Sequence, residues 1–114
     1  GVGVTTLDLG DRLAEVYYPT DPDAGAGLEP ERYTQLEPFP DEIRTLLADL
    51  DTEVVLDAYR DVPAATDGPF PVVQYSHGFG GFRKIVAFHA THLASWGFVI
   101  TSTDQPHSRN PFTT

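Results

Sequence analysis

The sequence lacks cysteine, has few basic residues and contains no long apolar run. Without cysteine, disulfides and thiolate catalysis are excluded, and the redox compartment cannot be inferred. No apolar run approaches the roughly 18 residues needed to span a bilayer, so no stable membrane anchor is expected. Seven lysines and arginines face 17 acids, which gives a formal net charge of −10. Nucleic acid and anionic lipid repel such a chain, so neither is an expected partner.

Two catalytic motifs are missing as well. A serine nucleophile on an α/β sheet needs glycine two positions before and two positions after it, because it lies on a strained turn without room for bulk. No serine of this chain has glycine at both positions, and Ser76 follows Gln74. A phosphate-binding P-loop is also missing, since the sequence contains neither Gly-Lys-Ser nor Gly-Lys-Thr.

Charge divides the 114 residues into two parts. Residues 1–70 hold 16 of the 17 acids and a net charge of −12, whereas residues 71–114 carry +2. We therefore expect a surface-exposed first part and a core-forming second part within one domain, or part of a larger one. The chain begins at Gly1 without a charged-then-apolar leader, so we expect the true N-terminus to be missing. Secretion and a cytoplasmic location both stay open.

The first 70 residues predict a hairpin and an irregular excursion. Two short strand-like segments flank Gly10 and predict an antiparallel hairpin over residues 1–18. Residues 19–40 are rich in proline and glycine without periodicity. A short, weak helix is expected after Pro40, and residues 52–59 fit either a helix or a strand.

A short apolar segment followed by three glycines is the most informative stretch. Residues 71–75 predict a buried strand, because β-branched and aromatic types favour strands. Gly78, Gly80 and Gly81 follow, and glycines let another molecule approach the main chain closely. The glycine-rich loop is therefore the candidate site.

A helix over residues 84–96 and a strand over residues 98–103 complete a βαβ unit, with parallel strands and a right-handed crossover. The strand shows no alternation, which is typical of a strand covered on both faces. The predicted buried face of the helix consists of Ile85, Val86, Ala90, Leu93, Ala94 and Trp96, with Lys84, Thr91 and Ser95 opposite.

Two of the four histidines have a spacing found in metal sites, but the sequence supplies no third ligand near them. His89 and His92 have a spacing that can place two imidazoles on one metal, but no third ligand lies nearby in the sequence. His89 falls inside the apolar face, which favours a partly buried packing residue. His107 lies in a polar loop and carries no specific prediction.

Two interpretations fit the glycine-rich loop. Gly78-x-Gly80-x-x-Arg83 resembles a dinucleotide fingerprint without its third glycine, and Asp104 lies where a ribose-binding acid is found, although it could equally be a loop cap. The alternative is an oxyanion hole, in which N–H groups face the oxygen that becomes negative during acyl transfer. In α/β-hydrolases one such donor comes from the loop after the third strand, often with a His-Gly sequence.

The second interpretation is strengthened by a resemblance. Ser76–Arg83, His92–Ile100 and Asp104–Pro106 look like the α/β-hydrolases related to platelet-activating-factor acetylhydrolase, dienelactone hydrolase and chlorophyllase. Leu13–Pro19 is similar to the second strand of that group. The segments Leu-Ala-Ser-x-Gly-Phe-Val and Asp-Gln-Pro-x-Ser-Arg also resemble cutinase-type polyester hydrolases. The resemblance covers residues 71–110 well and residues 1–20 loosely.

The resemblance implies a serine hydrolase of carboxylic esters, esterase- or lipase-like, without cofactor or metal. Phe79 would donate its backbone N–H to the oxyanion and line the acyl pocket, and Gly80 would also contact the substrate. His77 and Gly78 would form the loop, with His77 bracing it. The nucleophile, the acid and the catalytic histidine are expected beyond Thr114, so the chain alone is expected to be inactive.

We therefore predict an α/β fold that forms the N-terminal part of an α/β-hydrolase sheet. The expected strand order is 1-2-4-3, with strands one and two antiparallel and one crossover helix. Residues 1–114 would be one incomplete domain: a hairpin at 1–18, an acidic excursion with a short helix at 19–70, and strand, loop, helix and strand at 71–104. Residues 19–65 of the excursion would lie over or beside the site entrance. The expected partners are a small-molecule or lipid-like ester and, through an exposed sheet edge, further copies of the chain. A nucleotide-binding module and a non-catalytic fragment are the alternatives.

Overall fold

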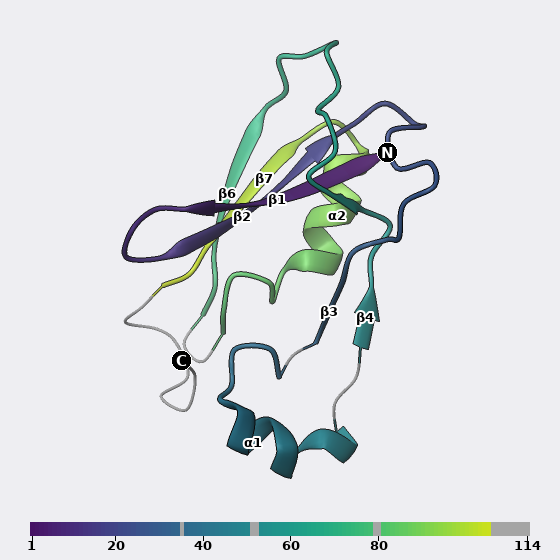
Figure 1. The fold of residues 1–114 in the computed structure, drawn as a ribbon. Helices are drawn as coiled ribbons and strands as arrows, with labels where there is room; N and C mark the ends of the chain where they lie inside the picture. Colours follow the sequence, from purple (N-terminus) through teal and green to yellow (C-terminus); the bar gives the residue numbers. More distant parts are fainter. Residues whose placement is uncertain (35, 51–52, 79–80, 106–114) are drawn as a thin grey trace.

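A computed structural model describes the chain except for residues 35, 51–52, 79–80 and 106–114 (Figure 1). The elements in chain order are β1 (Val2–Asp8), β2 (Leu13–Pro19), β3 (Arg32–Thr34), α1 (Asp41–Leu46), the 3-10 helix η1 (Ala48–Leu50), β4 (Glu53–Val55), β5 (Tyr59–Arg60), β6 (Val72–Ser76), α2 (Ala87–Ser95) and β7 (Val99–Thr103). The fold is therefore of mixed α/β class.

The main sheet has the strand order β5-β1-β2-β7-β6. β1 and β2 form an antiparallel hairpin that pairs Val2 with Pro19 and Asp8 with Leu13. Gly10 lies in its turn with a φ of 94°, a conformation that L side chains rarely adopt. β6 and β7 run parallel in a register that places Ser76 beside Thr103, so their carboxyl ends meet at one edge of the sheet.

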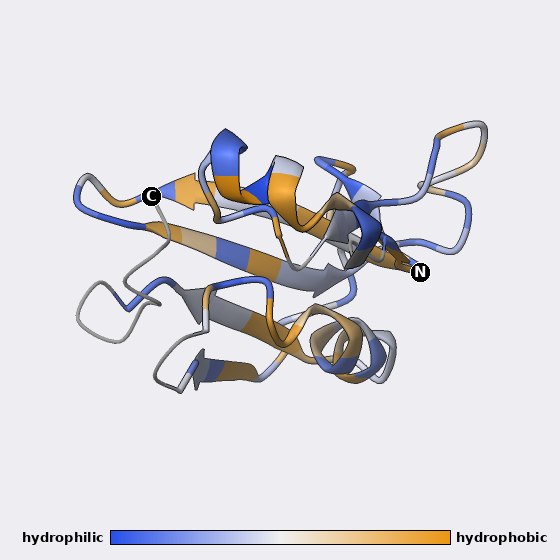
Figure 2. Ribbon diagram, turned by 90° about the horizontal axis from the view of Figure 1, so that it is seen from below, coloured by the Kyte–Doolittle hydropathy of each residue, from blue (hydrophilic) through white to orange (hydrophobic). Residues whose placement is uncertain are grey.

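The core lies between α2 and the main sheet. Buried residues of β1, β2, β7 and α2 form one cluster with Tyr33, Leu56, Ala58 and Phe82. Figure 2 shows hydrophobic residues along the strands and helices, whereas the turns are largely hydrophilic. Helix α2 presents small side chains to the sheet: Ala87, Ala90 and Ala94 are fully buried. Small residues allow a helix to approach a sheet closely, which explains why this face, rather than a bulkier one, is buried.

The prediction for this helix was wrong in two respects. The helix was expected to begin at Lys84, but residues 83–86 form turns and α2 begins at Ala87. Its expected buried face included Trp96, which is 74% exposed, while Thr91 on the expected polar face is buried. Thr91 can be buried because its hydroxyl donates to the carbonyl of Ala87 at 2.8 Å, within the helix itself.

The two parallel strands, β6 and β7, are also less buried in the structure than the sequence predicted. β6 is an edge strand in the described sheet, so Val72 and Val73 are 65% and 41% exposed rather than buried. β7 alternates, with Ile100 and Ser102 buried and their neighbours half-buried. One face of β7 packs against the core, and the other face is only partly covered.

The acidic excursion contains more regular structure than expected. β3 and β4 pair antiparallel, so part of the ambiguous segment 52–59 is a strand, and β5 pairs parallel to β1. The backbone of Glu31 joins the two sheets, because its N–H donates to the carbonyl of Ala58 and its carbonyl accepts from the N–H of Leu56. Figure 1 shows α1 apart from the main sheet, at the end of the β3–β4 pair.

Helix α1 has no buried residue, and Leu46 is 83% exposed. It begins after Pro40, which provides no side-chain cap.

Among the residues that the structure describes, no helix has the length and apolar character that crossing a membrane requires.

Candidate active site

The glycine-rich loop starts at the carboxyl end of β6, beside the carboxyl end of β7. This edge is where open α/β sheets place their chemistry. The structure describes His77, Gly78, Gly81 and the residues that follow, whereas Phe79 and Gly80 lie outside the described residues. The geometry of the loop is therefore defined by the contacts at its two ends.

His77 holds the first end of the loop. Its side chain is buried at 4% exposure, and Nε2 lies 2.8 Å from the backbone nitrogen of Gln105. A backbone N–H only donates, so Nε2 is the acceptor and carries no proton. Nδ1 then carries the proton and donates to the carbonyl of Gly78 at 2.8 Å. His77 is thus a neutral imidazole with both nitrogens engaged, and it joins the loop to the end of β7.

Gly78 and Gly81 have different surroundings. The N–H of Gly81 donates to the carbonyl of Gly78 at 3.1 Å. A Cβ on Gly81 would lie 3.2 Å from His77 Cβ and 3.3 Å from the Gly78 carbonyl oxygen, so a side chain there would force these neighbours to shift by a few tenths of an ångström. A Cβ on Gly78 would meet nothing within 4 Å. The space beside the Cα of Gly78 is therefore open, while its carbonyl oxygen is engaged by His77 and Gly81.

Arg83 holds the second end of the loop. Its backbone N–H donates to Asp104 Oδ1 at 2.9 Å, and its carbonyl accepts from Ser102 Oγ at 2.6 Å. Both ends of the loop are therefore attached to residues 102–105, at the end of one strand. These contacts fix the two described ends of the loop relative to each other.

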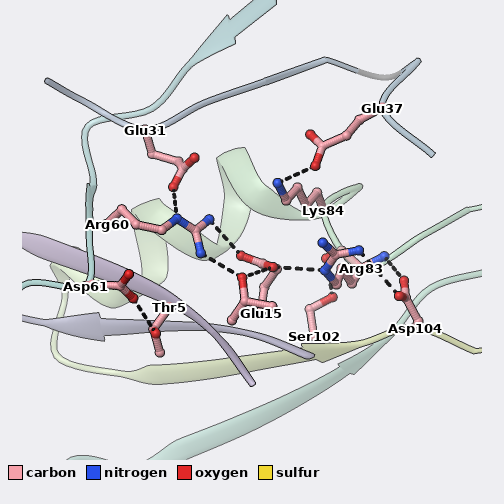
Figure 3. A network of polar contacts seen from close by, with 11 residues as sticks. Thr5, Glu15, Glu31, Glu37, Arg60, Asp61, Arg83, Lys84, Ser102 and Asp104 are labelled. Atoms are coloured by element: carbon pink, nitrogen blue, oxygen red, sulfur yellow. Dashed lines mark hydrogen bonds and ion pairs between the residues drawn. The ribbon is translucent and has the colours of Figure 1, made fainter. Parts of the chain in front are cut away.

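A buried glutamate continues these contacts into the sheet (Figure 3). Glu15 on β2 is fully buried, and its carboxylate lies 2.9 Å from Arg83 Nε and 3.1 Å from Arg60 Nη2. The hydroxyl of Thr6 donates to Glu15 Oε1 at 2.6 Å. A buried carboxylate is tolerated only when it is paired and hydrogen-bonded, and Glu15 meets both conditions.

Arg60 connects the same carboxylate to the acidic excursion. Its Nε lies 2.5 Å from Glu31 Oε2, and its Nη1 donates to Thr6 Oγ1 at 2.7 Å. Burial by itself lowers the pKa of Arg60, but the hydrogen bonds and charges of Glu31 and Glu15 outweigh burial and raise that pKa. Arg60 therefore stays charged, and its guanidinium bridges two carboxylates.

Lys84 forms a second, separate connection to the excursion. Its Nζ lies 2.6 Å from Glu37 Oε1, and its side chain is almost fully buried. The adjacent residues Arg83 and Lys84 thus form ion pairs with two different parts of the chain: the hairpin and the excursion (Figure 3).

A cavity of about 420 Å³ opens beside the second end of the loop. Its walls come from the hairpin turn, the excursion, the loop and the end of β7. The lining residues are Asp8, Gly10, Asp11, Arg12, Leu13, Glu37, Pro38, Phe82, Arg83 and Asp104. A volume of this size accommodates a small organic group.

The other candidates from the sequence do not assemble into a site. His89 is exposed on α2, so its expected packing role was wrong, and exposed His92 makes an edge contact with Trp96 at 6.2 Å between ring centroids. In the described part of the chain, no group of three or more histidine, cysteine or acidic residues could hold a metal ion. His107 lies outside the described residues.

The geometry does not fit the dinucleotide interpretation. That site needs a helix whose N-terminus follows the glycines directly, but turns at residues 83–86 separate Gly81 from α2. Asp104 is 6% exposed and accepts hydrogen bonds from Arg83, so it is not free to bind a ribose. Asp104 is a loop cap.

Sequence reasoning missed Glu15 and Arg60 as members of this arrangement. A signal was present, because Glu15 stands between Leu13 and Tyr17 on one face of an alternating strand. An acid in line with apolar residues predicts a buried carboxylate in need of a cation. The identity of that cation could not be read from the sequence, since Arg60 and Arg83 are far from Glu15 along the chain.

The chain resembles known proteins in both its fold and its sequence. A ferulic acid esterase from Streptomyces cinnamoneus superimposes with a TM-score of 0.57 at 19% sequence identity, over 99% of this chain. The chain spans 36% of the length of that esterase, and the likeness concerns the fold. No curated protein sequence matches significantly. Residues 27–110 match the family model described as platelet-activating factor acetylhydrolase, isoform II. The α/β-hydrolase resemblance is thereby confirmed, and the chain belongs to the platelet-activating factor acetylhydrolase isoform II family.

Proposed function

We propose that the whole protein hydrolyses carboxylic esters through an acyl-serine intermediate, and that residues 77–83 form its oxyanion loop. The observation that carries the proposal is the attachment of both ends of this loop to residues 102–105, at the carboxyl ends of two parallel strands. Membership of an acetylhydrolase family supports the same reaction class.

The proposal assigns a structural role to these 114 residues. They form one incomplete α/β-hydrolase domain, with the strand order 1-2-4-3 and α2 as the crossover helix between β6 and β7. Its parts are the hairpin at 1–18, the excursion at 19–70 and the strand, loop, helix and strand at 71–104. The excursion borders the site entrance, which agrees with the position of Glu37 and Pro38 in the cavity wall.

The chemistry follows from charge development. When a serine oxygen attacks the ester carbonyl, the carbonyl oxygen becomes negative, and fixed N–H donors stabilise that charge. We assign one donor to the backbone of Phe79, with Gly80 beside the substrate. His77 cannot serve as the general base in this arrangement, because its Nε2 accepts from Gln105 and its Nδ1 donates to Gly78. The serine, the acid and the catalytic histidine come from elsewhere in the protein.

The substrate class is a small-molecule or lipid-like ester, and the proposed reaction uses no cofactor. Six of the ten residues that line the cavity beside the loop are charged. Charged side chains in the wall favour an ester whose acyl or alcohol part carries hydrogen-bonding groups over a purely aliphatic one.

The direct test offers a fluorophosphonate probe and a short-chain nitrophenyl ester to the whole protein and, separately, to the 114-residue chain. We expect stoichiometric labelling and saturable hydrolysis by the whole protein, and neither by the chain alone. Labelling of Ser76 in the chain alone, or a whole protein that is inert toward every ester offered, contradicts the proposal.

A variant at Gly78 sharpens the test. A Cβ at this position has room, so Gly78→Val is expected to keep the melting temperature close to that of the wild type. A side chain between the loop backbone and the carbonyl oxygen should nevertheless lower kcat by about 10²- to 10³-fold, the usual effect of losing one oxyanion donor. Unchanged turnover in this variant would place the oxyanion hole elsewhere.

A further inference from the structure

We propose that Glu15 is a positioning residue for the oxyanion loop: it holds the guanidinium of Arg83 and thereby fixes the second end of the loop. The catalytic meaning of this inference rests on the proposed ester hydrolysis, whereas its structural part can be tested on the chain alone. Glu15 lies on β2, away from the loop in sequence, and touches no substrate in this scheme.

Arg83 is the residue through which Glu15 acts. Its side chain lies between two carboxylates, with Nε 2.9 Å from Glu15 and Nη1 3.4 Å from Asp104. Its main chain donates to Asp104 and accepts from Ser102. A guanidinium is planar with its donors in a fixed fork, so two partners determine its orientation. The position of Arg83 is therefore fixed twice: by the ion pairs of its guanidinium, and by the hydrogen bonds of its own backbone N–H and carbonyl.

Glu15 is the rigid member of this set. It lies on a strand that pairs with both β1 and β7, and its side chain is fully buried. Thr6 and Arg60 hold the carboxylate oxygens from the other side. A carboxylate with partners on both oxygens cannot rotate away. Asp104 follows the last residue of β7, and its N–H donates to the carbonyl of Leu13 on β2 at 2.9 Å, so both carboxylates that bind Arg83 are attached to β2.

The consequence concerns the residues between the two ends of the loop. His77 fixes the first end through Gln105, and Arg83 fixes the second end. Phe79, the assigned donor, lies between these two ends in the sequence, so we expect release of one end to impair the alignment of the donor with the substrate. A misplacement of about 1 Å in a catalytic arrangement costs about 10²-fold in rate. Since the donors act on the developing charge, the loss should fall on kcat rather than on KM.

The neighbouring ion pair provides a matched control. Lys84 follows Arg83 directly, is also nearly buried, and forms its ion pair with Glu37 of the excursion. Glu37→Gln removes a carboxylate next to the loop, just as Glu15→Gln does, but it leaves every described contact of Arg83 in place. A difference between the two variants therefore reports on the orientation of Arg83 and not on charge in general.

The first experiment measures amide hydrogen exchange by NMR in the 114-residue chain. The N–H of Arg83 is compared with that of Val99, which bonds the carbonyl of Pro71 at the opposite end of the same strand pair. In Glu15→Gln, exchange at Arg83 should rise about tenfold relative to Val99, the effect of losing a hydrogen bond to a charged group. In Glu37→Gln the ratio should stay within about twofold of wild type.

The second experiment measures kcat and KM for a nitrophenyl ester in the whole protein. Glu15→Gln should lower kcat by about 10- to 100-fold with KM nearly unchanged, whereas Glu37→Gln, a change in the cavity wall, should alter KM more than kcat. Arg83→Lys keeps the charge and the backbone N–H but cannot bond Glu15 and Asp104 as a fork, so it should resemble Glu15→Gln. Arg83→Lys also replaces Glu15→Gln in both experiments if that variant does not fold.

The outcomes separate the two proposals. A wild-type protein without esterase activity overturns the proposed function, and the exchange ratio still decides whether Glu15 positions the loop. Equal acceleration of Arg83 and Val99 exchange in Glu15→Gln overturns the positioning role, because it indicates a uniform loss of stability. Equal ratios in Glu15→Gln and Glu37→Gln, or an unchanged kcat in Glu15→Gln, overturn it as well.

Discussion

Two regions of the molecule differ in which side chains they bury: one buries charged groups, and the other exposes large apolar groups. Between the hairpin and the glycine-rich loop, charged side chains are buried: Glu15 is 0% and Asp104 6% exposed. We refer to Glu31, Arg60, Glu15, Arg83 and Asp104 as the buried ion network. On the outer surfaces, large apolar side chains are open: Phe88 and Trp96 on α2 are both 74% exposed, and Val72 on β6 is 65% exposed. We refer to these three residues as the open apolar faces.

The two regions differ in whether their side chains find all of their partners within the described residues. In the described part of the chain, every buried side-chain nitrogen and oxygen has a hydrogen-bond partner, so the buried ion network needs nothing further. The open apolar faces do need something, because sheets and helices of α/β proteins normally bury such surfaces against another layer. The described polar groups of the buried ion network thus have their partners within these residues, whereas the open apolar faces have no described cover.

The largest expected effect comes from breaking the buried ion network. Glu15→Leu removes the carboxylate that the half-buried Arg60 and Arg83 share, and each arginine keeps one other acidic partner. Removing one partner of a fully buried ion pair costs about 3–5 kcal/mol, so we expect the unfolding free energy to fall by at most about this amount. Urea denaturation of the 114-residue chain measures this cost. Leu46→Ala on α1, where the side chain is 83% exposed, serves as the control and should change stability by less than about 0.5 kcal/mol. Similar midpoints for the two variants would contradict the comparison.

High pH should also weaken the buried region. Burial, followed by the negative charge of Glu15, raises the pKa of Tyr17 above its ordinary value. The unfolded chain releases the tyrosine proton from about pH 10 while the folded chain retains it. The unfolded state then binds fewer protons, so this stabilisation is complete below about pH 10 and declines above it, by about 1.4 kcal/mol per pH unit.

The measurement is urea denaturation at several pH values between 9 and 12. Tyr17→Phe removes the titrating hydroxyl and should make the decline in unfolding free energy less steep. The same slope in the variant and the wild type would show that Tyr17 does not titrate as the buried position requires.

Two serines sharpen the comparison on a smaller scale. Ser102 is fully buried, and its hydroxyl donates to the carbonyl of Arg83 at 2.6 Å. Ser95 makes the same kind of bond to the carbonyl of His92 at 2.5 Å but is exposed. Ser102→Ala should cost about 1–3 kcal/mol because a buried carbonyl loses its partner, whereas water replaces the hydroxyl in Ser95→Ala. Thermal unfolding of the two variants measures the difference, and equal melting temperatures would be the contrary result.

The same contrast explains which parts of the fold could be predicted from the sequence. Local patterns indicated the hairpin and the segments of β6, α2 and β7, because alternation, glycines and helical spacing are local properties. Burial was predicted less well. Val72 and Trp96 were expected to be buried because they are apolar, yet burial depends on what lies opposite, and no described residue covers either of them enough to bury it. β3 and β5 were missed because strands of two or three residues carry too little pattern.

The candidate site divides in a similar way. The sequence identified the glycine-rich loop and the presence of Asp104 near it, because spacing and residue type are visible in one dimension. The partners of Arg83 were not visible, since Glu15 is 68 residues away along the chain. The sequence placed Arg83 in an incomplete dinucleotide fingerprint and in the hydrolase-like segment Ser76–Arg83, without a role of its own, whereas in the structure its side chain and backbone link the loop to the sheet. Phe79 and Gly80 lie outside the described residues, so their assigned roles stay predictions.

The smallest expected effect on stability belongs to the open apolar faces. Val72→Lys changes an exposed side chain on an edge strand, so the unfolding free energy should stay within about 0.5 kcal/mol of wild type. Its effect should appear in association instead. β6 lies at the edge of the described sheet, and an exposed edge with apolar side chains pairs readily with another strand. A lysine there opposes such pairing, so sedimentation velocity should show less oligomer for Val72→Lys than for wild type. Trp96→Lys on α2 removes an equally open apolar side chain away from the strand edge and should leave the oligomer in place. Loss of association in Trp96→Lys but not in Val72→Lys would assign self-association to the helix face and not to the edge of the sheet.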